Sequence, residues 1–230
     1  MFTHINIVTI IFSGCMMIAC KMHERNPPEV KDFCFISGSQ YSVREITKIE
    51  IEICTLLAFN LQIVTSHHFA DIFLRASYVS GNGVTRPICS MGYKVEDNDS
   101  HSNRNSSMAF MVDYLMEIAL LSHEFSQIEP SRVAAAAVYL ARATFGIRDA
   151  GDASKEYGQG FFSRTLKFYS GYDTGDLKEI IMELYELHKK SQGATLKSVY
   201  DKFSKEKFGL VALKIPVEKK LLSESLDSSI

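Results

Sequence analysis

Apolar residues recur every three or four positions along most of this chain, which is the spacing of a helix with one buried face. Ile46, Ile49 and Ile53 follow one another at this spacing, and Leu177, Ile181 and Leu184 do the same. With 13 glycines and 5 prolines in 230 residues, the chain has too few of the residues that a turn-rich β protein needs. The sequence therefore predicts an all-α fold.

Several predicted helices have a recognisable start. Ser42 and Glu45 have the spacing of a capping box, in which each side chain accepts a hydrogen bond from the other residue's backbone N–H. Pro130 suits a first helical turn. The spacing predicts helices over residues 7–20, 42–59, 65–77, 108–125, 133–145, 161–168 and 174–189, and a last one from residue 195. Residues 208–216 are predicted to be extended.

Residues 5–20 form a run without any charged side chain, and three interpretations compete for it. A signal peptide needs a positive start, but residues 1–4 contain no Lys or Arg. A membrane anchor needs about 20 apolar residues, which is more than this run offers. We therefore favour a core helix that is apolar on all sides. Membrane fractionation of the tagged protein would separate an anchored from a soluble form.

Charge and cysteine content narrow the functional classes further. The net charge is −2 and the pI is about 6.4, which argues against a strongly basic nucleic-acid binder. The five cysteines are odd in number, irregularly spaced and without a CxxC pair. This pattern favours free thiols in a reducing compartment over a disulfide framework.

The motifs of common active sites are incomplete in this chain. His123-Glu124 begins like a zinc-protease motif, but Gln127 stands where the second histidine ligand is needed. Neither a P-loop nor a GxSxG sequence occurs. We therefore expect an interaction protein rather than an enzyme, without a metal site, a cofactor or a small-molecule ligand.

The predicted helices repeat in a similar order. An all-apolar helix, a short helix and an amphipathic helix follow one another in the first half, and the same order returns from residue 133 on. Two helical domains of the same plan are expected. Residues 80–107 are polar and rich in Gly, Ser and Asn, which predicts a flexible insertion. The expected boundaries are a first domain at 1–79, the insertion at 80–107, a second domain at 108–213 and a polar tail at 214–230.

Short stretches of both halves carry a family pattern, in order and with matching spacing. In the first half they are Met16–Lys21, Asn26–Phe33, Tyr41–Glu50 and Leu57–Leu61. In the second half they are Tyr114–Glu117, Pro130–Ala136, Leu140–Arg142 and Lys202–Ala212. Together these stretches resemble the mitotic, A/B-type cyclins.

The resemblance implies a fold of two consecutive cyclin-box helical domains. In that family the apolar helix that ends at Lys21 is the third of five, and the present sequence has no residues for the first two. The first domain is therefore expected to be truncated at its N-terminus. An apolar helix without those neighbours is expected to expose a large apolar patch, which favours association.

The resemblance also implies a function. Such a protein is a regulatory subunit that binds and activates a cyclin-dependent serine/threonine protein kinase to control cell-cycle progression, in the nucleus and cytoplasm. It turns the kinase's C helix inward and so completes the Lys–Glu ion pair that positions ATP. No nucleic acid, membrane or small molecule is an expected partner. The implied kinase-binding residues are Ile18, Lys21, Met22, Glu24, Glu50, Cys54, Phe59 and Leu61.

Other interpretations of the same residues stay open. Lys21 lies near a helix C-terminus, where the helix dipole favours a cation, and Glu50 is compatible with a solvated residue near Lys48. The chain is also compatible with a degenerate or fragmentary cyclin-fold protein that activates no kinase. A cyclin-fold scaffold in transcription is a further alternative, but 25 Lys and Arg against 27 Asp and Glu argue against a DNA-binding surface.

Overall fold

The structure is a computed structural model that describes residues 4–80, 83–84, 100–147 and 161–227. The chain divides into two compact units, Met1–Ile63 and Val64–Ile230, and each is described by itself. Helices account for nearly all regular structure, which confirms the all-α prediction. Among the described residues, the only strands are an antiparallel pair of two residues each, β1 (Val79–Ser80) and β2 (Gly83–Val84), in which Val79 is paired with Val84.

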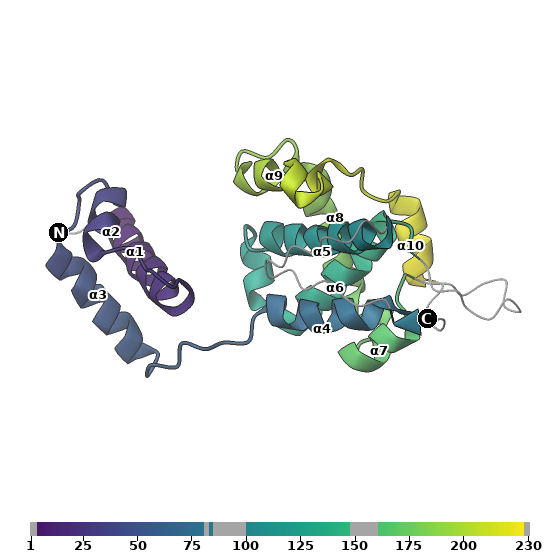
Figure 1. The fold of residues 1–230 in the computed structure, drawn as a ribbon, viewed down its shortest axis with the longest axis horizontal. Helices are drawn as coiled ribbons and strands as arrows, with labels where there is room; N and C mark the ends of the chain where they lie inside the picture. Colours follow the sequence, from purple (N-terminus) through teal and green to yellow (C-terminus); the bar gives the residue numbers. More distant parts are fainter. Residues whose placement is uncertain (1–3, 81–82, 85–99, 148–160, 228–230) are drawn as a thin grey trace, which may run out of the picture. The chain divides into compact units, whose positions relative to one another are not determined.

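Unit 1 consists of α1 (His4–His23), α2 (Val30–Ile36) and α3 (Val43–Leu56), and α1 and α3 pack along each other (Figure 1). The capping box predicted at the start of α3 is present, because the Ser42 backbone donates to Glu45 Oε2 at 2.8 Å and the Glu45 backbone donates to Ser42 Oγ at 3.4 Å. The small core of this unit contains Met17, Phe33, Tyr41 and Ile46.

Helix α1 is buried along one side only. Met17 is fully buried, whereas Val8 is 68% exposed and Phe12 is 63% exposed. The expectation of a helix buried on all sides is therefore wrong for this unit, and the expected exposed apolar patch is present. No helix in the described ranges combines the length and the apolarity that crossing a membrane requires.

Unit 2 is built around α6 (Pro130–Thr144), which packs against α4 (Ser66–Tyr78), α5 (Ser100–Ala119) and α8 (Thr174–Ser191) (Figure 1). Every residue of α6 from Val133 to Ala143 is buried, as its apolar sequence predicts, and Pro130 occupies the first turn. The remaining elements are η1 (His123–Gln127), α7 (Arg164–Ser170), α9 (Ser198–Phe203), η2 (Glu206–Phe208), η3 (Val211–Leu213) and α10 (Lys219–Asp227).

Two expected boundaries differ in the structure. Helix α4 packs against α6 and buries Phe73 and Leu74 in the core of unit 2. The boundary between the units in the chain therefore follows residue 63 rather than residue 79. Helix α5 begins at Ser100, inside the segment expected to be a flexible insertion, and not near Met108. The rest of that expected insertion, residues 81–82 and 85–99, lies outside the described residues.

The expectations for the C-terminal end are wrong. Residues 208–216 were expected to be extended, but they contain the end of η2 and the whole of η3, in which Val211 is fully buried. Residues 214–230 were expected to be a polar tail. They contain α10, whose Leu222 and Leu226 are fully buried in the core, because these two leucines lie one turn apart on the same helix face.

A buried arginine connects three elements of unit 2. The side chain of Arg142 is 1% exposed, and its Nε donates to the Phe161 carbonyl at 2.7 Å. Its guanidinium also donates to the Ser77 carbonyl at 2.6 Å. Arg142 thus ties α6 to the end of α4 and to the segment before α7.

Candidate functional site

The candidate site of unit 1 rests on a close crossing of α1 and α3. At Gly14 an added Cβ atom would lie 2.9 Å from Ile49 Cγ2 and 3.0 Å from Ile53 Cδ1. Real Cβ atoms essentially never approach a neighbour to 2.9 Å, so a larger residue at this point of α1 would force the side chains of Ile49 and Ile53 to shift. The close approach fixes α1 against α3 and positions the side chains of their adjoining turns.

Lys21 and Glu50 meet across this helix pair. Lys21 Nζ donates to Glu50 Oε1 at 2.6 Å, with the Lys21 side chain 44% exposed and the Glu50 side chain 17% exposed. Lys21 lies in the last turn of α1, where the helix dipole favours a cation. The neighbouring lysine, Lys48, pairs with Glu52 at 3.6 Å instead. The structure therefore brings together the two residues to which the resemblance assigned the central contact.

Three of the other predicted contact residues lie close to Lys21 in the chain, at the end of α1. Met22 is 42% exposed, Glu24 is exposed and Ile18 is partly buried. The Glu24 carboxylate also lies beside Cys20, whose pKa is raised by burial and by a hydrogen bond to Glu24. This end of α1 therefore presents apolar and charged groups together.

Cys54 differs from the other candidates, because it is only 8% exposed. Its side chain belongs to the interior of unit 1, so a direct contact with a partner is not supported for it. Cys15, Cys20, Cys34 and Cys54 are all free thiols, as the sequence predicts, and Cys89 lies outside the described residues.

The last two candidates follow α3 in a tight turn. The Phe59 backbone N–H donates to the Cys54 carbonyl at 2.8 Å, and the Ala58 N–H donates to the Thr55 carbonyl at 3.0 Å. These two bonds define a Schellman motif. Ala58 and Phe59 have φ angles of +49° and +57°, so α3 ends at Leu56 and not near Phe59 as predicted. The turn leaves Phe59 71% exposed and Leu61 partly buried.

Sequence reasoning missed apolar residues at the same end of α3. Leu56 is 86% exposed and Leu57 is 44% exposed, although their spacing predicts a buried stripe that continues from Ile53. A glycine in the left-handed conformation usually marks such a helix end in a sequence. Here Ala58 and Phe59 adopt that conformation, so the sequence does not show where α3 ends.

Within the described residues, no group of three or more His, Cys, Asp or Glu side chains is arranged to hold a metal ion.

Comparison with known proteins gives the same division of the chain. The family model described as "Cyclin, N-terminal domain" matches residues 3–62, and the one described as "Cyclin, C-terminal domain" matches residues 64–216. These two ranges meet where the structure separates its two units. Helix α4 therefore belongs with the C-terminal domain in both descriptions.

Proteins similar to this chain include A-type cyclins. Cyclin-A2-1 of Arabidopsis thaliana is 30% identical over 198 residues, which cover 86% of this chain and 38% of the relative. Putative cyclin-A3-1 of the same plant is 31% identical over 206 residues, covering 90% and 49%. G2/mitotic-specific cyclin-A of Hydra viridissima is 25% identical over 210 residues, covering 91% and 42%. The chain thus spans less than half the length of these relatives. With family models matched over both of its units, the chain belongs to the cyclin family.

Proposed function

We propose that the surface around Lys21 and Glu50 binds a cyclin-dependent protein kinase and stabilises its active arrangement. Membership of the cyclin family supports the class of partner. The observation that carries the proposal is the Lys21–Glu50 pair itself, held at 2.6 Å at the surface of two tightly packed helices. In this role the chain is a regulatory subunit that contributes no reactive group.

The chemistry of the pair suits the recognition of a protein backbone. An ammonium group has three N–H donors, and the bond to Glu50 uses one of them. The Glu50 carboxylate likewise retains lone pairs for backbone N–H groups. A kinase helix end or loop can therefore accept from Lys21 and donate to Glu50 without breaking the bond between them. Charged hydrogen bonds of this kind fix the orientation of a partner.

Other predicted contact residues of unit 1 offer apolar side chains for contact area. Met22 and Phe59 are exposed, and Leu61 is partly buried. Docking would remove these side chains from water and would also desolvate the ion pair, which strengthens its hydrogen bonds to the partner. Such a surface activates a kinase only if it binds the active arrangement of the C helix more tightly than the inactive one.

The test uses a panel of purified cyclin-dependent kinases. The native chain is expected to copurify with at least one of them and to raise its rate of peptide phosphorylation. Lys21→Ala combined with Glu50→Ala is expected to cost about 2–5 kcal/mol of binding free energy. The matched control is Lys48→Ala combined with Glu52→Ala, which removes a more exposed ion pair from α3. Equal losses in both variants, or binding without any rise in phosphorylation, would count against the proposal.

A further inference from the structure

One stretch of unit 2 is strongly basic, although the chain as a whole is weakly acidic. Residues 189–220 contain nine lysines, no arginine and three Asp or Glu residues, which give a net charge of +6. Because the net charge of the whole chain is −2, the remaining residues carry −8. The basic stretch runs from the end of α8 through α9, η2 and η3 to the start of α10. Its charge is opposite in sign to that of the rest of the protein.

Most of the positive charge in this stretch is not neutralised by ion pairs. Three of the nine lysines pair with carboxylates of α5, α8 and α10. Within the described residues the other six form no ion pair, and all six are exposed. Such a surface attracts anionic groups. The six are Lys189, Lys190, Lys197, Lys205, Lys207 and Lys214.

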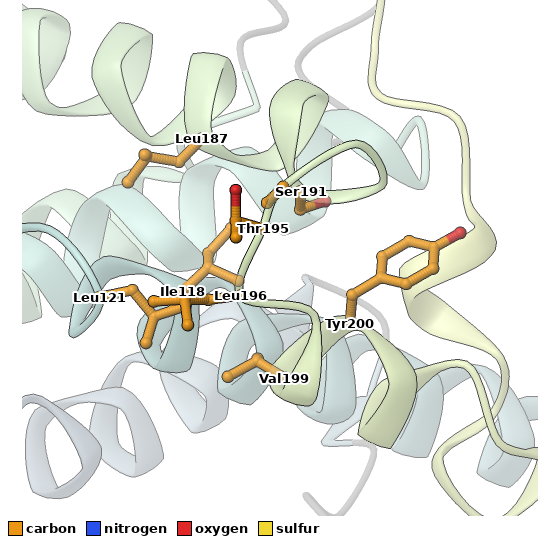
Figure 2. Close-up of a pocket in the computed structure, with 9 residues that line it drawn as sticks. Ile118, Leu121, Leu187, Ser191, Thr195, Leu196, Val199 and Tyr200 are labelled. Atoms are coloured by element: carbon orange, nitrogen blue, oxygen red, sulfur yellow. The ribbon is translucent and has the colours of Figure 1, made fainter.

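The first part of the basic stretch forms one wall of an apolar groove. The groove lies between the ends of α5 and α8, the segment of residues 192–197 and α9 (Figure 2). Its volume is about 270 Å³, below the roughly 300–1,000 Å³ typical of small-molecule sites, so its size suits the side chains of a protein segment. The residues that define it here are Ile118, Leu121, Leu187, Leu196, Val199 and Tyr200, and we call this set the α8–α9 groove.

The mouth of the α8–α9 groove is apolar as well. Leu196 is 66% exposed, Leu121 is 50% exposed, and its neighbour Leu120 is 85% exposed. Single exposed leucines are common, but leucines gathered at the mouth of a groove indicate a surface that binds another protein. An occupant of the groove therefore needs large apolar side chains.

Two of the unpaired lysines lie directly beside residues that line the groove. Lys190 precedes the lining residue Ser191, and Lys197 follows the lining residue Leu196. Since consecutive Cα atoms are about 3.8 Å apart, both lysine side chains start at the edge of the groove. Lys190 belongs to the last turn of α8, and Lys197 is the residue before α9. The two lysines thus stand at opposite ends of the segment that closes one side of the groove.

Carboxylates close to these two positions have partners of their own. Glu186, one turn before Lys190 on α8, accepts a hydrogen bond from Lys219 at 2.7 Å. Glu117, which precedes the lining residue Ile118, pairs with Lys202. The charges of Lys190 and Lys197 therefore remain for a partner, and charge complementarity requires anionic groups in that partner.

The residue types in the basic stretch also bear on which anion it meets. Arginine is the residue that matches phosphate groups with two parallel hydrogen bonds, and this stretch has none. An apolar groove is likewise of no use to a sugar–phosphate backbone. We propose that the α8–α9 groove binds a segment of a partner protein in which large apolar side chains are flanked by Asp or Glu residues that pair with Lys190 and Lys197. The groove lies entirely in unit 2, so its test does not depend on the kinase contact of unit 1.

The experiment displays random 16-residue peptides on phage and selects those that bind the full chain. Peptides that combine Leu, Ile, Met or Phe with Asp or Glu are expected to be enriched, and the Leu196→Ser variant is expected to enrich none of them. Ile215→Ser is the control, because Ile215 belongs to the same basic stretch and is 87% exposed but does not line the groove. Equal enrichment on Leu196→Ser, or enrichment of peptides without acidic residues, would overturn the proposal.

A second measurement tests the two lysines. The most enriched peptide is labelled, and fluorescence anisotropy gives its affinity for each variant. Lys190→Glu combined with Lys197→Glu is expected to weaken binding at least about tenfold. Lys205→Glu combined with Lys207→Glu changes the net charge of the same stretch equally, at exposed positions that are not next to lining residues, and is expected to weaken binding less than about threefold. Equal losses in the two variants would show that only the overall charge attracts the peptide, which contradicts the proposal.

Two further probes test the class of partner. Short duplex DNA and phosphatidylserine vesicles both carry dense negative charge but no apolar side chains flanked by carboxylates. Neither is expected to displace the labelled peptide at about 0.15 M salt, where charges beyond about 8 Å are largely screened. Displacement of the peptide by the DNA or by the vesicles would contradict the proposal.

Discussion

Lys21 Nζ lies 2.6 Å from Glu50 Oε1, and this contact connects the last turn of α1 to α3. Both side chains are reached by water, so the pair contributes only about 0–1 kcal/mol to folding. Its structural consequence is that two opposite charges are presented at a fixed spacing. That spacing depends on how closely α1 and α3 pack at Gly14.

Gly14→Val is expected to destabilise unit 1 by about 1–3 kcal/mol, because the new side chain overlaps Ile49 and Ile53. Urea unfolding followed by circular dichroism measures the loss, and hydrogen exchange of α1 and α3 localises it. Adding Ile49→Ala should restore part of the stability. The control is Gly175→Val in α8, where no atom lies within 4 Å of an added Cβ. An equal loss at Gly14 and Gly175 would show that packing is not the cause.

Ala58→Gly is expected to stabilise unit 1 by about 0.5–1 kcal/mol, because Ala58 has a φ of +49° and glycine adopts this conformation without strain. Gly38 ends α2 with a φ of +69° and nothing lies within 4 Å of an added Cβ, so Gly38→Ala should have the opposite sign. Thermal unfolding of both variants checks the pair. A loss of stability in Ala58→Gly would mean that the methyl group makes contacts that outweigh the strain.

Arg142→Met is expected to cost about 2–5 kcal/mol, since it leaves the Phe161 and Ser77 carbonyls buried without their charged donor. Arg132→Met is the matched control on the same helix. Arg132 donates to the Asp176 carbonyl at 2.6 Å in an exposed position, and water can replace it there. Urea unfolding is expected to show a loss below about 1 kcal/mol for the control. Similar losses at the two positions would argue against a special role for the buried arginine.

His188 is expected to make unit 2 sensitive to acid. It is 3% exposed and packs edge to face on Tyr114, and burial lowers its pKa from 6.5 to about 4. Between these pH values the unfolded chain binds a proton that the folded chain does not. The contribution of neutral His188 to the free energy of unfolding is therefore fully present above pH 6.5. It is lost as the pH falls to 4, and the total loss is about 3 kcal/mol.

The measurement compares urea unfolding at pH 7 and at pH 4.5. His188→Phe keeps an aromatic ring against Tyr114 but cannot be protonated, so its loss of stability should be smaller by about 2–3 kcal/mol. His123→Phe, at an exposed position, should lose as much as the native chain. The same acid sensitivity in His188→Phe would assign the effect to other groups.

The sequence predicted the elements that carry a strong local signal. Helix α6 follows from Pro130 and its long apolar stretch, and the start of α3 follows from the Ser42–Glu45 capping box. Helix α10 was missed, because Leu222 and Leu226 are only two apolar residues in a polar segment and do not by themselves predict a helix. Their burial in the core is seen only in the structure. The place of α4 in unit 2 is likewise a matter of tertiary contact, which periodicity does not contain.

Some features of the candidate site could likewise be predicted from the sequence, and others could not. Family resemblance placed Lys21 and Glu50 together, and the structure joins them in an ion pair. Residue spacing along the chain does not show that Cys54 turns inward or that Phe59 turns outward, since both follow from the way α3 ends and packs.

Exchanging the two charges tests the central claim most directly. The double variant Lys21→Glu, Glu50→Lys retains an ion pair between α1 and α3 but reverses the donor and the acceptor that a partner meets. It should melt within a few degrees of the native chain, since surface pairs contribute little to stability. Calorimetric titration with the cyclin-dependent kinase that the native chain binds is expected to give no detectable binding. Binding as tight as that of the native chain would show that the pair serves the fold alone and would contradict the proposed kinase contact.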